Sequence, residues 1–180
     1  MPRCFSLAIL SLGLIAVVPA HAQSADRSSI ATVEAQWKQL TGYLTQVAEE
    51  TSEADYAWKP VETVRSIGEM VGHVAGAQYL ICAAALGDPA PDEDAVERSA
   101  KTKAALVAAL KASTTYCAKA YAQTDQALQA PTEVFGQSNT RFGALVLNAI
   151  HNGEHYGNLI TYLRIRGVVP PSSRPQSPSN

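Results

Sequence analysis

Three histidines have the type and spacing expected of a metal site: His73, His151 and His155. His151 and His155 are four positions apart, so on a helix their imidazoles stand one turn apart on the same face. Neutral imidazole nitrogens are good ligands for zinc and for several other divalent transition metals. The pattern therefore predicts one bound divalent ion. Zinc is favoured, and nickel, iron or copper are compatible with the same ligands.

The competing interpretation is that each histidine is an ordinary core residue bonded to a nearby carbonyl, which we would prefer for a lone histidine. Three histidines on two predicted core helices make that interpretation weaker. Glu154 does not complete the H-E-x-x-H motif of zinc proteases, because Asn152 follows His151 directly. The paired Glu-x-x-His motifs of a di-iron site are also missing from the sequence. No residue stands at a recognisable catalytic spacing, so the catalytic residues are unknown.

The elements that must position the histidines are four helices. Apolar residues three and four apart predict a helix over 29–50, and a Ser66/Glu69 capping box starts a second helix that ends before Gly87. No charged residue occurs between positions 71 and 86, so this second helix should be the buried centre of the core. Further helices over 99–123 and 140–166 complete an all-α four-helix bundle with no credible strand.

Glu69 has two competing roles. It lies one turn before His73 and could accept a hydrogen bond behind a metal ligand. Its place in the capping box is the favoured interpretation, because Ser66 and Glu69 have the S-x-x-E spacing at the start of an apolar run.

A long crossover connection is predicted between the second and third helices. The acidic, proline-containing stretch after Gly87 reads as exposed and is long enough to return along the bundle, so these two helices could run parallel. Cys82 and Cys117 would then lie at nearly equal height, whereas an antiparallel arrangement would separate them by about 20 Å. A disulfide and two buried thiols both stay open. The segment 124–139 should fold over one end of the bundle.

The first 22 residues read as a signal peptide. Arg3 precedes an apolar segment, and Ala20-His21-Ala22 offers an A-x-A cleavage site. The apolar segment is short for a membrane span, so we expect no stable membrane anchor. The mature chain should be exported, either to a periplasm or outside the cell, where disulfides can form.

Chain length, composition and net charge indicate the domain organisation and the kind of partner. A single domain over 23–169 is expected, followed by a mobile Ser/Pro-rich tail over 170–180. The net charge is −2 and the sequence has no basic run, so no nucleic-acid partner is expected.

Four segments carry a resemblance to a known family: W-K-P at 58–60, R-S-I-G-E-M-V-G-H-V-A at 65–75, H-N-G-E-H-Y-G-N-L at 151–159 and Y-L-R at 162–164. In these segments the chain resembles the DinB/YfiT-like family, and the resemblance covers nearly all of the mature chain in order. His73, His151 and His155 match the family's three metal ligands residue by residue.

The resemblance implies a four-helix bundle with a crossover connection, a divalent ion near one end, and often a homodimer. Some relatives are thiol-dependent transferases or isomerases, and many have no assigned reaction. The leading hypothesis is a metal-dependent enzyme that performs thiol-dependent transfer or hydrolase-type chemistry on an unknown small molecule. The alternatives are a non-catalytic metal or small-ligand binding module of the cell envelope, and a purely structural helical protein.

Overall fold

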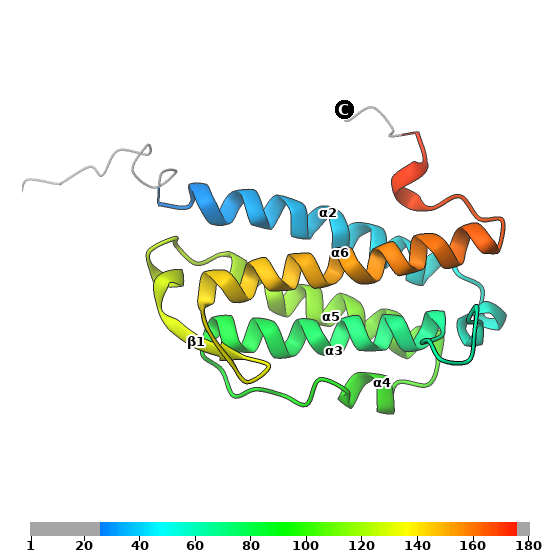
Figure 1. Cartoon of the computed structure of the whole chain (residues 1–180), viewed down its shortest axis with the longest axis horizontal. Helices are drawn as coiled ribbons and strands as arrows, with labels where there is room; N and C mark the ends of the chain where they lie inside the picture. The colour runs from blue at the N-terminus through cyan, green and yellow to red at the C-terminus, as the bar shows by residue number, and fades with distance from the viewer. Residues whose placement is uncertain (1–25, 176–180) are drawn as a thin grey trace, which may run out of the picture.

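Four long helices packed side by side form the body of the protein in the computed structural model, which describes residues 26–175 (Figure 1). They are α2 (Ser28–Glu50), α3 (Ile67–Leu86), α5 (Lys103–Tyr121) and α6 (Arg141–Ile165). The all-α four-helix bundle predicted from the sequence is confirmed. The predicted signal peptide (1–22) and residues 176–180 lie outside the described residues.

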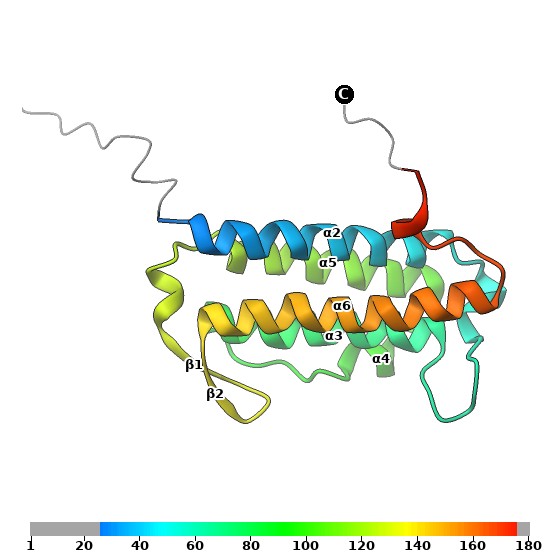
Figure 2. The ribbon, with the colours of Figure 1, turned by 45° about the horizontal axis from the view of Figure 1, so that its top comes forward.

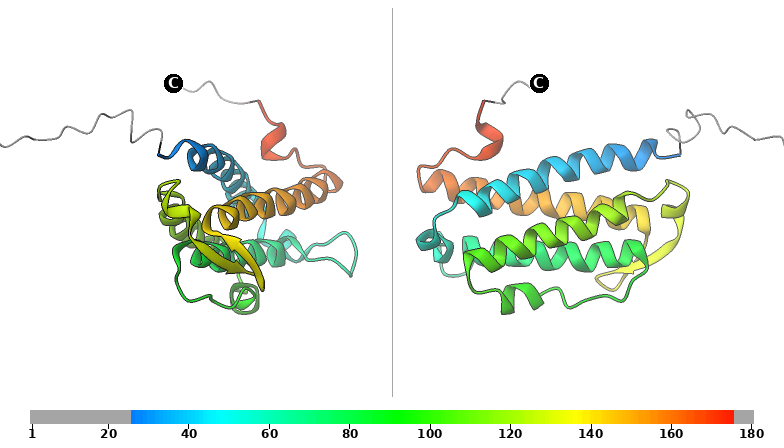
Figure 3. Two further views of the ribbon diagram at one scale, coloured as in Figure 1. Left: turned by 60° about the vertical axis from the view of Figure 1, so that its left-hand side comes forward. Right: turned by 180° about the vertical axis from the view of Figure 1, so that it is seen from behind.

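The crossover connection lets two neighbouring helices run parallel. α3 packs against α5 and α6, and α2 packs against the same two helices, so α2 and α3 lie diagonally across the bundle (Figure 2). Residues 87–102 return along the outside of the bundle, and α5 then runs in the direction of α3 (Figure 3). Cys82 and Cys117 consequently lie at the same height, with Cα atoms 5.3 Å apart, and form a disulfide.

α3 is the buried centre of the core, as its lack of charge predicted. Val74, Ala75 and Ile81 are fully buried, and the left-handed C-cap at Gly87 has φ 81°. Among the described residues, α3 is long and apolar enough to cross a membrane by length and composition, yet 78% of its apolar window is buried inside the bundle. Packing against α5 and α6 therefore accounts for its apolar composition.

The prediction that the chain has no strand is wrong. β1 (Pro131–Val134) and β2 (Gln137–Thr140) form an antiparallel hairpin at one end of the bundle, where segment 124–139 was expected (Figure 2). Phe135 and Gly136 have φ of 52° and 71°, and positive φ at both central residues is what a type I′ hairpin turn requires. Sequence reasoning misses these strands because they are short and polar, and because Phe-Gly is an uncommon turn pair.

The crossover connection contains a short helix that the sequence analysis did not predict. α4 (Ala95–Ser99) packs against α3. The backbone then becomes extended at Ala100, and the Thr102 side chain caps α5 by accepting a hydrogen bond from the Ala105 amide at 3.2 Å. The third long helix therefore begins at Lys103 and not at Ser99. Short 3-10 helices lie in the other connections, at Glu53–Ala57 (η1) and Ala127–Gln129 (η2).

The start of the predicted mobile tail lies against the bundle. Pro170 and Pro171 are buried, and Pro171–Ser173 forms a 3-10 helix (η3) that packs against α2. The Tyr156 hydroxyl donates to the Ser172 Oγ at 2.9 Å, and the Ser172 amide donates to the Tyr156 oxygen at 2.9 Å. These contacts fix the path of the chain after α6.

Candidate metal centre

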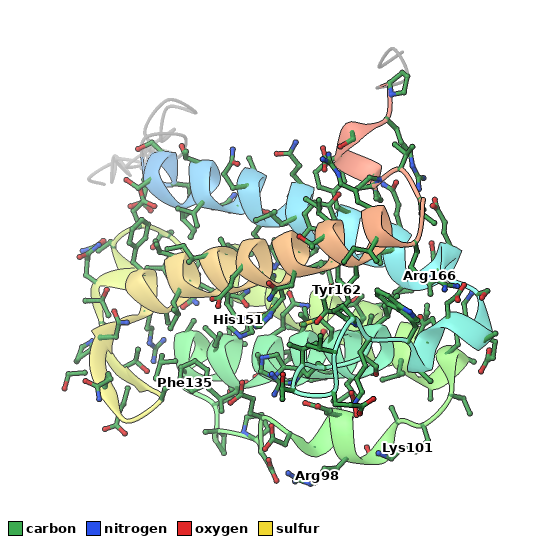
Figure 4. The ribbon with its side chains drawn as sticks, turned by 45° about the vertical axis from the view of Figure 1, so that its right-hand side comes forward. Arg98, Lys101, Phe135, His151, Tyr162 and Arg166 are labelled. Carbon is green, nitrogen blue, oxygen red and sulfur yellow. A yellow bond between two sulfur atoms is a disulfide. The ribbon has the colours of Figure 1, made fainter. Side chains whose placement is uncertain are left out.

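α6 carries two of the three predicted ligands. Thr140 caps its first turn by accepting a hydrogen bond from the Gly143 amide at 3.0 Å, and the helix continues to Ile165. His151 lies near the middle of α6 (Figure 4). His155 follows one turn later, and both imidazoles pack against that of His73 on α3. The family resemblance implied an ion near one end of the bundle. His151 and His155 lie near the middle of α6, whereas His73 lies in the second turn of α3.

α3 carries the third predicted ligand, and its capping box sets where the helix begins. The Glu69 amide donates to the Ser66 Oγ at 3.2 Å, and the Ser66 amide donates to the Glu69 carboxylate at 2.7 Å. These two hydrogen bonds confirm the capping role of Glu69. His73 follows one turn later and is 7% exposed.

The three imidazoles converge at their Nε2 atoms. The Nε2 of His155 lies 3.1 Å from that of His73 and 3.0 Å from that of His151. The ligand atoms of all three residues lie within 4.8 Å of one another. Two different core helices thus bring the predicted histidines to one point.

Hydrogen bonds among the three imidazoles cannot give every Nε2 atom a partner of its own. A neutral imidazole nitrogen carries either a proton or an in-plane lone pair, so the Nε2 of His155 cannot donate to one neighbour and accept from the other. If it accepts from both, two donors share one lone pair. The Nδ1 atoms of His73, His151 and His155 are all buried without a hydrogen-bond partner. A cation at the meeting point would use three Nε2 lone pairs and leave a proton on each Nδ1.

The nitrogen separations suit a shared ion. Two imidazole ligands about 2.1 Å from one ion are about 3.0 Å apart at a right angle and about 3.4 Å apart at a tetrahedral angle. The observed 3.0 and 3.1 Å fall at the lower end of that range. Such angles leave the opposite side of the ion free for other ligands.

The surroundings keep the imidazoles neutral. Burial, with a smaller contribution from the Arg65 charge, lowers the pKa of His73 to about 4. Burial and the neighbouring His155 lower the pKa of His151 to about 3, and burial also lowers the pKa of His155. Neutral imidazoles are the form that binds metal, so little competition from protons is expected near neutral pH.

Three carboxylates that sequence reasoning missed stand beside His73. Its Nδ1 lies 3.6 Å from a Glu93 oxygen and 4.0 Å from a Glu97 oxygen, and Asp94 belongs to the same group. All three come from the crossover connection. The sequence does contain a sign that another segment packs closely on α3. Gly72 and Gly76 lie one turn apart on this helix, and small residues with this spacing allow such close packing.

A cavity of about 670 Å³ opens beside the histidines. His155 lies in its wall together with Asn158 and Tyr162 of α6, and the connection before α3 contributes Lys59 and Arg65. The Tyr162 hydroxyl donates to the Arg65 carbonyl at 3.1 Å, which ties that connection to α6. A small molecule could therefore reach the side of His155 from solvent.

Comparison with known proteins gives a family and a fold. Residues 36–159 match the model of the DinB superfamily, a range that includes all three histidines. No curated protein matches the chain. The crystal structure of a DinB-like protein from Bacillus cereus ATCC 10987 is similar, with a TM-score of 0.66 and 14% identity over 77% of this chain and 93% of that chain. At that identity the likeness supports the fold alone. Because the family match spans most of the sequence, the chain belongs to the DinB superfamily.

Proposed function

We propose that the protein binds one divalent metal ion through His73, His151 and His155 and acts as a metal-dependent enzyme. The observation that carries the proposal is the convergence of three Nε2 atoms, with that of His155 lying 3.1 Å from His73 and 3.0 Å from His151. No placement of protons on neutral imidazoles gives each of these nitrogens its own hydrogen bond. Zinc is the favoured ion because three neutral imidazoles with open positions resemble catalytic zinc sites. Nickel, iron and copper remain compatible with these ligands.

An ion held in this way would acidify a bound water or thiol, or polarise a carbonyl. The chain's own residues keep the imidazoles neutral and shape the cavity beside His155. The cavity wall contains both positive side chains, Lys59 and Arg65, and negative ones, Glu62, Glu69 and Glu97, so it offers a substrate groups of either charge. Thiol-dependent transfer and hydrolysis both fit an open three-histidine site, and the predicted signal peptide supports export.

A non-catalytic binding module is the second candidate. It is favoured by the carboxylates in the cavity wall, each of which already bonds to another group of the protein. Glu69 is held in the capping box, and both oxygens of Glu97 accept from the Arg65 Nε at 3.2 Å. Glu62 is paired with Lys59 at 2.9 Å and is exposed. None of the described carboxylates that line the cavity is therefore free to act as a general base beside His155.

Metal titration of purified protein tests metal binding itself. Protein stripped with a chelator should bind one Zn²⁺ per chain by calorimetry, and free zinc at 100 times the dissociation constant should add about 2.7 kcal/mol to the free energy of unfolding. His151→Ala should lose both effects. Glu154→Ala is the matched control, because Glu154 is exposed on the same turn of α6. Equal zinc binding by His151→Ala and the unsubstituted protein would show that the imidazoles are not the ligands.

Turnover separates the two candidates. A metal-dependent enzyme should convert at least one substrate in a panel for thiol transfer and ester or amide hydrolysis, and His151→Ala should abolish that activity. A binding module would show ligand-induced stabilisation of the zinc-loaded protein with no turnover across the panel.

A further inference from the structure

The crossover connection approaches the side of His73 opposite its Nε2. The Nδ1 of His73 is buried without a hydrogen-bond partner. A carboxylate oxygen of Glu93 lies 3.6 Å from this nitrogen. The Glu97 carboxylate is at 4.0 Å. No comparable carboxylate contact is present at the Nδ1 of His151 or His155 within residues 26–175. Only one of the three candidate ligands thus has acidic groups behind it.

Two glycines of α3 make this approach sterically possible. A Cβ atom on Gly76 would lie 1.8 Å from the Glu93 carbonyl oxygen, and one on Gly72 would lie 3.0 Å from the Glu97 Cα. Any larger residue at position 76 would push the connection away from the helix. The connection is therefore packed against α3 at the level of His73, and its carboxylates are not on a freely extended loop.

The two nearest carboxylates differ in their other contacts. Glu97 accepts from the Arg65 Nε through both of its oxygens, at 3.2 Å each. Glu93 makes no ion pair with a lysine or arginine among the described side chains, and its side chain is 26% exposed. A shift of about half an ångström would bring the Glu93 oxygen from 3.6 Å to hydrogen-bonding distance of the His73 Nδ1, and no ion pair with a lysine or arginine opposes it.

We propose that Glu93 is a positioning residue for the metal site: it accepts a hydrogen bond from the Nδ1–H of His73 and so fixes the Nε2 lone pair toward the ion. The proposal rests on the proposed metal site. A metal-bound histidine commonly donates its second N–H to a carboxylate, which sets the tautomer and raises the basicity of the ligand. The crossover connection is then part of the site, and ion binding should tighten it against α3.

Substitutions at Glu93 test this role through metal affinity. Glu93→Ala should weaken Zn²⁺ binding by about 10- to 100-fold, which is the usual effect of removing such a partner. Glu93→Gln should lose less, because an amide oxygen still accepts from the Nδ1–H. Asp92→Asn is the matched control, since Asp92 neighbours Glu93 but accepts from Arg98, and it should bind zinc as the unsubstituted protein does. Circular dichroism should show equal helix content in all four proteins.

Two further readouts separate a positioning role from a general loss of structure. The visible absorption spectrum of the Co²⁺-loaded protein should shift in Glu93→Ala and be restored toward the original by Glu93→Gln. Zinc should slow amide hydrogen exchange in residues 88–98 of the unsubstituted protein, and this protection should be absent from Glu93→Ala at saturating zinc.

The failure of this proposal is distinguishable from failure of the proposed function. If the unsubstituted protein binds no zinc, the metal site itself is wrong. If it binds zinc and Glu93→Ala binds equally tightly with an unchanged Co²⁺ spectrum, the site stands and the role of Glu93 is refuted.

Discussion

α3 is joined to its neighbours at two places that differ in chemistry. Cys82 links it to α5 through the disulfide with Cys117, and both residues are fully buried. His73 meets α6 through His155, and both imidazoles keep buried Nδ1 atoms without partners. The first link is a completed covalent bond, whereas the second has unused donors and acceptors. Unsatisfied buried polar groups are rare in folded proteins. Among the described side chains, Asn148 beside the disulfide has one such atom, whereas three of them, the Nδ1 atoms, gather at the histidine cluster, which makes that cluster the candidate functional region.

Gln78 lies between the two links and shows what a structural polar group looks like here. Its side-chain oxygen accepts from the Trp37 indole at 3.0 Å and from the Asn152 amide at 3.3 Å, and its amide donates to the Ser113 Oγ at 3.0 Å. It thereby contacts α2, α6 and α5 at once. A fully buried group whose hydrogen bonds are all made stabilises the bundle, whereas each of the three histidines leaves its Nδ1 without a partner.

Removal of the disulfide should have the largest effect on stability and little effect on the histidine region. In the Cys82→Ala/Cys117→Ala double variant the free energy of unfolding should fall by about 3–4 kcal/mol, because the bond closes a loop between residues 35 apart in the sequence. Urea denaturation of the metal-free protein measures the loss. Zinc affinity, measured by calorimetry, should stay within a factor of about 3. A large loss of zinc affinity would mean that the two regions are coupled.

Acid should act on the histidine region and spare the disulfide. In metal-free protein the free energy of unfolding should be nearly constant above about pH 7.5 and fall as the pH is lowered through about 6.5 toward 5. The unfolded histidines take up protons near pH 6.5, whereas the folded pKa of His73 is about 4 and that of His151 about 3. The unfolded state thus binds more protons in this window. As the pH is lowered, the free energy of unfolding should therefore fall by at most about 1.4 kcal/mol per pH unit for each histidine.

Urea denaturation between pH 5 and 7.5 measures this slope. His151→Asn should reduce it, because one titrating group is removed, and the double cysteine variant should keep it. Below about pH 4.5 carboxylates with lowered pKa, such as Glu69, add their own loss of stability, so the comparison is restricted to the higher range. An unchanged slope in His151→Asn would contradict a buried neutral imidazole at this position.

The sequence could predict the features that depend on local periodicity. The capping box at Ser66, the buried character of α3 and the one-turn spacing of His151 and His155 all follow from residues close together in the chain. The disulfide needed one additional inference, the parallel direction of α3 and α5, which the length of the connection allowed but did not require. For that reason the sequence left two alternatives and the structure resolved them.

Features that depend on contacts between distant segments could not be predicted. Glu93 and Glu97 stand in an acidic stretch with no hydrophobic period, and only the packing of that stretch on Gly72 and Gly76 brings them to His73. The hairpin turn at Phe135 was hidden for a related reason. Its strands have little apolar alternation, and only Val134 is buried, so tertiary contacts at the end of the bundle decide its conformation.

The smallest expected effect concerns Glu69, which lines the cavity but is bonded within the capping box. Ser66→Ala removes the acceptor for the Glu69 amide and should lower the free energy of unfolding by about 1 kcal/mol. Glu69→Gln should cost less, because an amide oxygen can still accept from the Ser66 N–H. Neither substitution should change zinc affinity, since the capping box lies a full turn from His73. If Glu69→Gln weakened zinc binding as much as Glu93→Ala, the carboxylate behind His73 would be Glu69 and the start of α3 would belong to the functional region.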